Sequence, residues 1–360
     1  MKKALLFYFL FATIVTNAQS IAAYIDYRNY FTVFDSGIKY PIEHNRVKSF
    51  KTGGKQVANV DYLENFKVFY NGNVTTLERV PIGNYMVSDY LIAYTLAIGS
   101  ELYVVDKSKQ ILLTTRASFY SVGDSIVTFY DQLSQSYKAY YRGKITELEY
   151  VSDDPAKDEK LSDNVAAFIS RTDELRVFYR GEITPLLLIS PPITYQVGKN
   201  IVAYFDGYTS TFKAFYKGNT YEVEPIEPLS FKTGDDMVAY ETQDWTFNVF
   251  YDQRITKLSS YQPKFYEVAD SLVIFQEFNN FNVFYKGKIH TLESNYIPDK
   301  YYADYSTLVY FDQQNRLTCF FRGKKNIVTY EPVNEFNLYR NALHYRINNA
   351  DYVYWMGKSF

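Results

Sequence analysis

The chain consists of short apolar runs of strand length that are separated by turn residues. In residues 212–216 (FKAFY), one face of an extended strand carries Phe212, Ala214 and Tyr216, and the other face carries Phe215. A sheet that packs on one side only alternates cleanly between apolar and polar positions, so these strands are predicted to be covered on both faces. Helical periodicity is absent throughout, which predicts an all-β chain.

One motif recurs along the chain at a regular spacing. It has the form Asp-Ser-Ile-Val-Ala-Tyr, as in residues 124–129 (DSIVTF) and 235–240 (DDMVAY). Its ten copies begin 34 to 39 residues apart, at Gln19, Lys55, Asp89, Asp124, Asp163, Lys199, Asp235, Asp270, Ser306 and Arg340. Self-similarity at one period indicates tandem repeats, here ten units of about 36 residues.

A second motif, of the form F-K-V-F-Y-x-G-K, follows the first within the units. Examples are residues 66–72 (FKVFYNG), 212–218 (FKAFYKG) and 281–287 (FNVFYKG). An Asn-Gly or Lys-Gly pair between two β-patterned runs is typical of a two-residue hairpin turn, whose central residues need positive φ. Together with a turn inside the first motif, such as Gly123-Asp124, this predicts four antiparallel strands in each unit, a to d.

Proline positions indicate the order of these strands. Nine of the eleven prolines fall in the connection after strand d, and the other two, Pro41 and Pro185, fall in strand d itself. Proline cannot donate to a β-ladder and is confined to sheet edges. Strand d is therefore predicted to be the outer edge, with strand a nearest the axis.

Four-stranded sheets that stack on a neighbour at each face are the blades of a β-propeller. The sequence therefore predicts an all-β fold, a β-propeller of about nine to ten short four-stranded antiparallel blades. Residues 19–360 form this single tandem-repeat domain. Two five-bladed rings and an open β-solenoid remain as alternatives, because the chain starts at strand b of unit one and stops just past strand c of unit ten.

The repeats resemble the short-period propeller repeats of exported bacterial proteins, including the WD40-like and WG-type groups. The resemblance spans the chain after residue 18 and is one of architecture, since the units are shorter than the roughly 40 to 45 residues of a WD40 unit. The Gly-His and Trp-Asp landmarks are missing. Such families imply binding more often than catalysis, and the resemblance transfers no functional residue.

Residues 1–18 have the pattern of a secretory signal peptide. Lys2 and Lys3 precede the apolar run 4–15, which is too short to span a bilayer, and small or polar residues follow it. We expect cleavage before Gln19 and export to the periplasm, cell surface or extracellular space. Because no second long apolar run follows, no transmembrane segment is expected in the mature chain.

Composition disfavours several classes of function. The chain has 38 Lys and Arg against 40 Asp and Glu, with a net charge of −2 and no basic patch, so no nucleic-acid partner is expected. A lone cysteine, Cys319, rules out an internal disulfide framework and a cysteine-based zinc site. Aromatic residues make up 19% of the chain, and we assign most of them to packing between blades.

Candidate catalytic motifs coincide with the repeat. Residues 123–126 (GDSI) resemble the GDSL block of a hydrolase family, with Ser125 as nucleophile, but residues 88–91 (SDYL) and 198–201 (GKNI) occupy the same repeat position. A tight a-to-b turn explains all three. The histidines His44, His290 and His344 show no spacing of a triad or a metal pair. No catalytic residue and no cofactor is predicted.

Recurrent aspartates end strand b in several units, at Asp26, Asp131, Asp206 and Asp312. Aspartate is favoured where a chain enters a loop, because its side chain accepts hydrogen bonds from nearby backbone amides. No calcium-loop motif occurs in the sequence. These residues are therefore interpreted as turn residues, and no metal site is predicted.

Candidate binding residues lie in the longer loops. If strands a to d alternate in direction, the tight a-to-b and c-to-d turns share one face of the ring, and the longer b-to-c and d-to-a connections share the other. Binding residues concentrate on loops held by a rigid scaffold. The b-to-c loops carry six candidate aromatic residues: Tyr27, Tyr30, Tyr62, Tyr208, Trp245 and Phe278.

Three functions are consistent with this pattern. The favoured hypothesis is a non-catalytic secreted or envelope-associated scaffold that binds a protein partner through its longer-loop face. The alternatives are a glycan-binding propeller, which would show equivalent pockets in successive units, and an enzyme that degrades an extracellular polymer. The enzyme would require carboxylates that converge near the axis.

Overall fold

The computed structural model describes residues 21–150, 159–188 and 194–360. The predicted signal peptide and most of the insertion after strand d of the fourth unit lie outside these residues. The described parts contain 39 β-strands, arranged in ten antiparallel sheets in which consecutive strands pair. We number the sheets in chain order as blades 1 to 10.

The first five blades are formed by β1 (Ile21–Ile25), β2 (Phe31–Asp35) and β3 (Ile38–Glu43); β4 (Ser49–Thr52), β5 (Gln56–Val60), β6 (Phe66–Tyr70) and β7 (Asn73–Glu78); β8 (Ile82–Val87), β9 (Leu91–Leu96), β10 (Leu102–Asp106) and β11 (Lys109–Thr114); β12 (Ala117–Val122), β13 (Ile126–Asp131), β14 (Ser136–Tyr141) and β15 (Lys144–Tyr150); and β16 (Lys160–Leu161), β17 (Val165–Ile169), β18 (Glu174–Tyr179) and β19 (Glu182–Leu188).

The last five blades are formed by β20 (Tyr195–Val197), β21 (Ile201–Asp206), β22 (Thr211–Tyr216) and β23 (Asn219–Glu224); β24 (Ser230–Thr233), β25 (Met237–Glu241), β26 (Phe247–Tyr251) and β27 (Arg254–Ser259); β28 (Tyr266–Ala269), β29 (Leu272–Glu277), β30 (Asn280–Tyr285) and β31 (Lys288–Glu293); β32 (Tyr301–Asp304), β33 (Thr307–Phe311), β34 (Leu317–Phe321) and β35 (Lys324–Thr329); and β36 (Glu335–Tyr339), β37 (Ala342–Ile347), β38 (Ala350–Trp355) and β39 (Lys358–Ser359).

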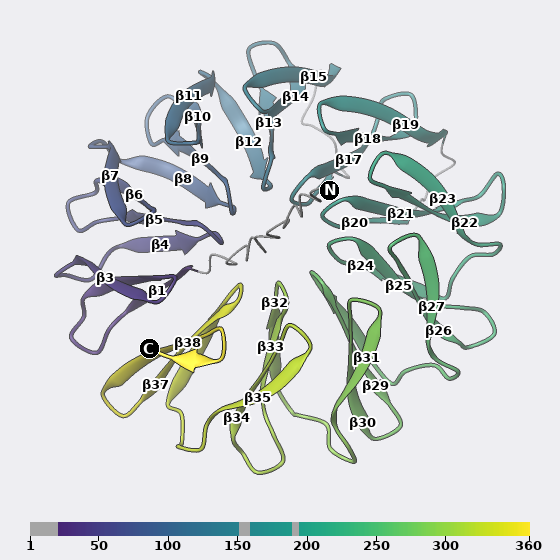
Figure 1. Ribbon diagram of the computed structural model, residues 1–360. Coiled ribbons are helices and arrows are strands. Elements are labelled where there is room, and N and C mark those ends of the chain that lie inside the picture. The colour runs from purple at the N-terminus through teal and green to yellow at the C-terminus, as the bar shows by residue number, and fades with distance from the viewer. Residues whose placement is uncertain (1–20, 151–158, 189–193) are drawn as a thin grey trace, which may run out of the picture.

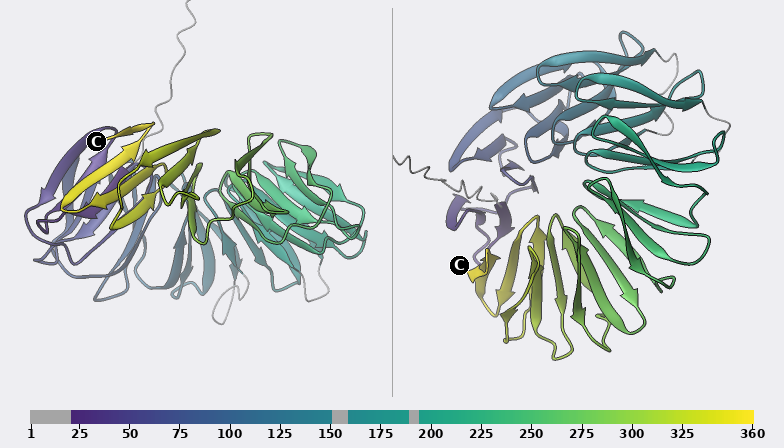
Figure 2. Two further views of the ribbon diagram at one scale, coloured as in Figure 1. Left: turned by 90° about the horizontal axis from the view of Figure 1, so that it is seen from below. Right: turned by 45° about the vertical axis from the view of Figure 1, so that its right-hand side comes forward.

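The blades stand side by side in one closed ring, with the first strand of a four-stranded blade nearest the centre (Figure 1). Figure 2 shows the same ring from the side and obliquely, as a single tier of blades. The prediction of a propeller is confirmed, with ten blades rather than two five-bladed rings or an open solenoid. Pro41 and Pro185 lie in β3 and β19, the outer strands of their sheets, as predicted.

The hydrophobic core lies between blades, because both faces of the middle strands are apolar. One cluster joins Phe212 and Ala214 of blade 6 to Val238 and Tyr240 of blade 7, and all four side chains are buried. Similar clusters fill the other seams. The two apolar faces that the sequence shows in each strand therefore pack against the two neighbouring blades.

The ring closes by packing of blade 1 against blade 10. The Tyr24 and His344 rings stack with centroids 4.1 Å apart, and Phe34 packs beside Trp355. Arg346 donates a hydrogen bond across the seam to the carbonyl oxygen of Ile25 at 2.9 Å. In the described residues, every strand pairs only with strands of its own blade, so side-chain packing rather than an exchanged strand closes this ring.

Candidate functional site

The aspartates at the end of strand b form the b-to-c loops. Asp61 is typical: its Oδ1 accepts hydrogen bonds from the amides of Leu63 and Asn65, each at 2.9 Å, and Lys67 Nζ lies 2.8 Å from its Oδ2. Partial burial works against ionisation, but the Lys67 ammonium and these donors lower the pKa of Asp61. The same cap occurs at Asp26, Asp131, Asp206 and Asp312. The aspartates shape the loops, as the turn interpretation predicts.

Five of the six predicted aromatic residues project from these loops into solvent. Tyr27, Tyr62, Tyr208, Trp245 and Phe278 are all exposed, with 72% of Tyr62 and 72% of Tyr208 accessible. Tyr30 is half-buried, with Arg28 over its ring and His44 in a T-shaped ring contact with it. Alternating strand directions place all of these b-to-c loops on one face of the ring, as expected.

Aliphatic residues at the same loop tips extend this surface. Leu63, Ile98 and Leu133 are exposed, and Ile98 is 88% accessible. These residues are absent from the predicted set, which contains aromatic residues only, although their repeat position identifies them. We call the combined set from seven blades the apolar crown: Tyr27, Tyr62, Leu63, Ile98, Leu133, Tyr208, Trp245 and Phe278.

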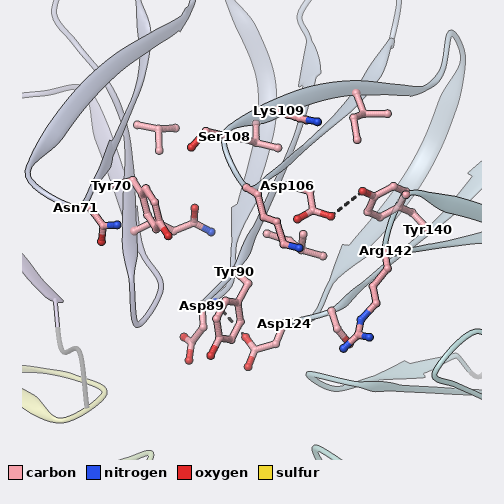
Figure 3. Close-up of a pocket in the computed structure, with 18 of the residues that line it drawn as sticks. Tyr70, Asn71, Asp89, Tyr90, Asp106, Ser108, Lys109, Asp124, Tyr140 and Arg142 are labelled. Atoms are coloured by element: carbon pink, nitrogen blue, oxygen red, sulfur yellow. Dashed lines mark hydrogen bonds between the residues drawn. The ribbon is translucent and has the colours of Figure 1, made fainter. Parts of the chain in front are cut away.

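The opposite face, which carries the tight turns, has a groove of about 1220 Å³ across blades 2, 3 and 4. It runs from the c-to-d turns at Asn71, Ser108 and Arg142 to the a-to-b turns at Asp89 and Asp124 (Figure 3). The sequence pattern predicts no site on this face, because binding is expected at the longer loops.

A departure from the repeat in blade 3 explains the groove. In eight of the ten repeats the last two residues of strand c are both aromatic, and blade 1 keeps one aromatic residue there. In the regular seams the last ring packs edge-on against a ring of the next blade, as Tyr216 does on Phe250 with centroids 6.1 Å apart. Blade 3 has Val105 and Asp106 instead, so two rings are missing.

The residues around the missing rings adapt in two ways. Tyr70 of blade 2 faces Val105 instead of a ring and is 41% exposed. Tyr140 of blade 4 donates its hydroxyl hydrogen bond to Asp106 Oδ2 at 2.8 Å, which replaces ring packing by a polar contact. The change from Phe-Tyr to Val-Asp is visible in the sequence and could have identified the groove.

The a-to-b turns line the axis and are joined by hydrogen bonds from blade to blade. The amides of Ser125, Asn164 and Asn200 donate to the carbonyl oxygens of the next turn, at Asp163, Lys199 and Asp235, over 3.0, 3.2 and 3.0 Å. The Ser125 hydroxyl donates to Asn164 Oδ1 at 2.7 Å. Ser125 is therefore part of an inter-blade link, and the three histidines lie in blades 1, 8 and 10, far from it along the ring.

Six carboxyl groups and two cations meet where these turns surround the axis. Lys199 Nζ lies 2.9 Å from Asp124 Oδ2 and 2.8 Å from Asp163 Oδ2. Arg340 of blade 10 reaches Asp89 of blade 3, with 3.2 Å between Nη2 and Oδ1. The other three carboxyls belong to Asp235, Asp270 and Asp304. We call these eight residues the axial charge cluster.

Two cations do not neutralise six carboxylates, and several of the carboxyls resist ionisation. Burial and the neighbouring Asp270 raise the pKa of Asp235 to about 7. Burial, then Asp163 and Asp89, raise the pKa of Asp124 to about 6 despite Lys199. Burial also raises the pKa of Asp304 to about 6. The described residues contain no group of three or more His, Cys, Asp or Glu side chains arranged to hold a metal ion.

These features define a closed ten-bladed β-propeller with exposed apolar loop tips on one face and a groove on the other. The chain belongs to the family of the 10-bladed beta propeller domain, whose model matches residues 15–360. A comparison with curated protein sequences gave no match. No helix in the described part of the chain is long and apolar enough to cross a membrane.

The solved structures that this chain matches share little sequence with it. They include the computationally designed Ika8 protein, with 16% identity, coverage of 74% of this chain and 93% of that chain, and a TM-score of 0.32. The CRINKLY WD40 ectodomain of the Arabidopsis thaliana receptor kinase ACR4 has 11% identity and a TM-score of 0.35, and the match covers 68% of this chain and 94% of the ectodomain. Hsv2p of Kluyveromyces lactis has 9% identity to this chain and a TM-score of 0.33, and the match covers 79% of this chain and 99% of Hsv2p.

Proposed function

We propose that this propeller is a non-catalytic interaction scaffold that binds a protein partner through its longer-loop face. The observation that carries the proposal is the apolar crown, in which eight large apolar side chains are exposed on one face. Exposed apolar surface of this kind marks interaction sites, because a soluble protein gains nothing by keeping it in water. Tyr and Trp at the loop tips are the side chains most enriched at protein interfaces.

The variation between loops favours a protein partner over a glycan. The crown has aromatic tips at Tyr62 and Trp245, aliphatic tips at Ile98 and Leu133, and no exposed large apolar residue in the b-to-c loop of blade 5. A repeating glycan would select equivalent pockets in successive blades. A surface that differs at each blade suits one asymmetric partner with its own matching contour.

Affinity capture from cell-envelope extracts tests the proposal. The triple variant Tyr62→Ser, Tyr208→Ser and Trp245→Ser is expected to lose the captured partner and to bind the purified partner at least about tenfold more weakly. The matched control replaces exposed apolar residues of the outer strands, Ile38→Ser, Ile255→Ser and Ile289→Ser. Equal loss in both variants, or retention by the crown variant, would contradict the proposal, and specific binding to a glycan array would favour the glycan alternative.

We also propose that the protein acts outside the cytoplasm. The proposal is supported by the basic, apolar and small-residue pattern of residues 1–18. Cell fractionation and N-terminal sequencing of the mature protein test it, with Gln19 as the expected first residue. A cytoplasmic protein that retains Met1 would overturn it.

A second candidate function is hydrolysis of an extracellular polymer, and the axial charge cluster is the observation that favours it. Hydrolases that use carboxyl groups for acid–base catalysis need one carboxyl that stays protonated near neutral pH beside another that is ionised. Asp235, with its raised pKa, would be the general acid. The test is release of fragments from envelope polysaccharides or proteins, and an activity that Asp235→Asn leaves unchanged would exclude this site.

A further inference from the structure

The groove of the tight-turn face has an apolar floor and tyrosine walls. Val68, Leu91, Val105 and Ile111 lie at its base, on strands of blades 2 and 3. Tyr70 and Tyr90 also line the groove, with 41% and 52% of their surfaces exposed, and Lys55 Nζ lies 4.4 Å from the ring centroid of Tyr90. Partly exposed tyrosine side chains suit contacts to apolar groups and to peptide planes, because each offers a flat apolar ring and a polar hydroxyl group.

Its two ends carry opposite charge. At the outer end, the c-to-d turns present Lys107, Lys109 and Arg142, which are all exposed and outnumber the single carboxylate there, Asp106. At the axial end, the lining includes Asp89, Asp124 and Lys199 of the axial charge cluster, in which six carboxyl groups outnumber two cations. Asp124 is already paired with Lys199 and Asp89 with Arg340, so a ligand ammonium would share these carboxylates with the two cations. A ligand that fits both ends has a cationic group and an anionic group separated by an apolar stretch.

We propose that this groove binds a short extended peptide, with a free ammonium group at the axial carboxyls and a carboxylate at Lys107, Lys109 and Arg142. The apolar side chains of the peptide then lie between Tyr70 and Tyr90. Polar groups along the lining, such as the side chains of Asn73 and Ser108, are placed to meet peptide amides. The site is independent of the scaffold proposal, because the groove and the apolar crown lie on opposite faces of the ring.

The charge distribution favours a peptide over a neutral glycan. A neutral sugar makes no use of cations at one end of a groove and carboxylates at the other, and it leaves both sets with only part of their interactions. A peptide with free termini carries its two charges at opposite ends of a chain. An ammonium at the axial end also supplies the positive charge that Lys199 and Arg340 provide only in part for the six carboxyls.

The probe is an equimolar pool of synthetic hexapeptides, offered to the purified mature protein and analysed by mass spectrometry of the bound fraction. Three forms are compared: free termini, acetylated amino terminus and amidated carboxyl terminus. We expect acetylation to lower retention by about tenfold or more, since it removes a charged donor from a desolvated site, and amidation to lower it less at the exposed outer end.

Two variants with controls localise the binding. Arg142→Ala is expected to weaken binding, because Arg142 lines the groove. Arg180→Ala is the matched control and is expected to leave binding unchanged, because Arg180 is not in the groove lining. It has the same repeat position in blade 5 and stacks on Tyr179 as Arg142 stacks on Tyr141. The double variant Val105→Phe with Asp106→Tyr restores the missing ring pair and is expected to abolish binding while the thermal melting temperature stays unchanged or rises.

Several outcomes would overturn the proposal. They are equal retention of free and acetylated peptides, equal effects of Arg142→Ala and Arg180→Ala, and binding of neutral oligosaccharides in place of peptides. If the double variant Val105→Phe with Asp106→Tyr does not fold, the comparison of Arg142→Ala with Arg180→Ala still tests the proposal. The crown variant Tyr62→Ser, Tyr208→Ser and Trp245→Ser is expected to bind peptides normally, which separates failure of this site from failure of the scaffold proposal.

Discussion

At the scale of single residues, aspartate has two opposite roles in this protein. In the b-to-c loops, Asp131 accepts hydrogen bonds from Lys138 and from its own loop, and despite partial burial these donors lower its pKa to about 2. At the axis, burial and neighbouring carboxyls raise the pKa of Asp235 to about 7. The loop aspartates stabilise the fold in their ionised form, whereas Asp235 is favoured in its protonated form.

Replacement of Asp235 by asparagine should therefore change stability in a pH-dependent way. The folded pKa of Asp235 lies above its unfolded value, so its contribution is present at low pH and is lost as the pH rises from about 4 through 7. Asp235→Asn is expected to stabilise the protein by about 1–3 kcal/mol at pH 8 and to have little effect at pH 4.

Chemical denaturation at the two pH values measures this effect. Asp61→Asn is the control of opposite sign, because the lowered pKa of Asp61 means that its ionised form stabilises the folded state at pH 8. A change in unfolding free energy that is the same at pH 4 and pH 8 for Asp235→Asn would show that the axial carboxyl is not held protonated by the fold.

At the scale of elements, the blade is the repeating unit, and its contacts with the next blade explain the motif at the a-to-b turn. Gly198 directly follows strand a of blade 6, and a Cβ atom there would overlap the carbonyl oxygen of Gly234 in blade 7. A Cβ atom at Gly234 would likewise overlap the carbonyl oxygen of Asp270 in blade 8. Near the axis the blades approach so closely that backbone meets backbone, and glycine makes this approach possible.

Gly198→Ala is accordingly expected to destabilise the protein, because one methyl group must displace the backbone of the next blade. Overpacking of this kind costs about 1–3 kcal/mol. Gly207→Ala is the matched control, since no heavy atom lies within 4 Å of a Cβ built at Gly207. Thermal and urea denaturation of both variants measure the difference, and equal stabilities would contradict the close approach of blades 6 and 7.

At the scale of the whole molecule, stability depends on an unbroken ring of seams. Blade 1 meets blade 10 through side chains such as Tyr24, Phe34 and Val353, which are buried only because the ring is closed. The seam between blades 9 and 10 contains Cys319, the single cysteine of the chain, together with Leu343 and Tyr354. Opening of the ring at blade 10 would expose both seams to water.

Cys319 should report such opening. Burial raises the pKa of its thiol to about 12, so the folded protein contains almost no reactive thiolate at this position. We expect a thiol-specific reagent to leave the native protein unlabelled and to label it fully in denaturant, with a midpoint equal to that of the loss of far-ultraviolet circular dichroism. Rapid labelling under native conditions would show that the tenth blade detaches while the other blades stay folded.

Much of the architecture could be predicted from local patterns. The repeated Asp-Ser turn, the hairpin glycines and the prolines at positions 41 and 185 depend on backbone conformation and hydrogen bonding within one unit, and the structure agrees with each. The same local patterns predict that Tyr62 and Trp245 lie in b-to-c loops, and the structure agrees. Their part in binding stays a prediction.

The axial charge cluster and the groove could not be predicted in this way. Arg340 and Asp89 are 251 positions apart in the sequence and meet only because ten blades close on one axis. The raised pKa of Asp235 depends on how many carboxyls share that axis and how little water reaches them. The groove could be predicted only in part. Val105 and Asp106 stand out in the sequence, but they indicate a groove only when it is known that the rings of neighbouring blades pack together.

The sequence by itself determines the strand, the turn and the repeat, because these depend on the alternation of side chains and on residues a few positions apart. It also determines that both faces of each sheet are covered. Only the tertiary structure decides that the ring closes at ten blades, which carboxyls meet at the axis and where two absent rings leave a groove. These properties arise from contacts between distant blades, whose energies depend on how closely the blades approach and how far water is excluded.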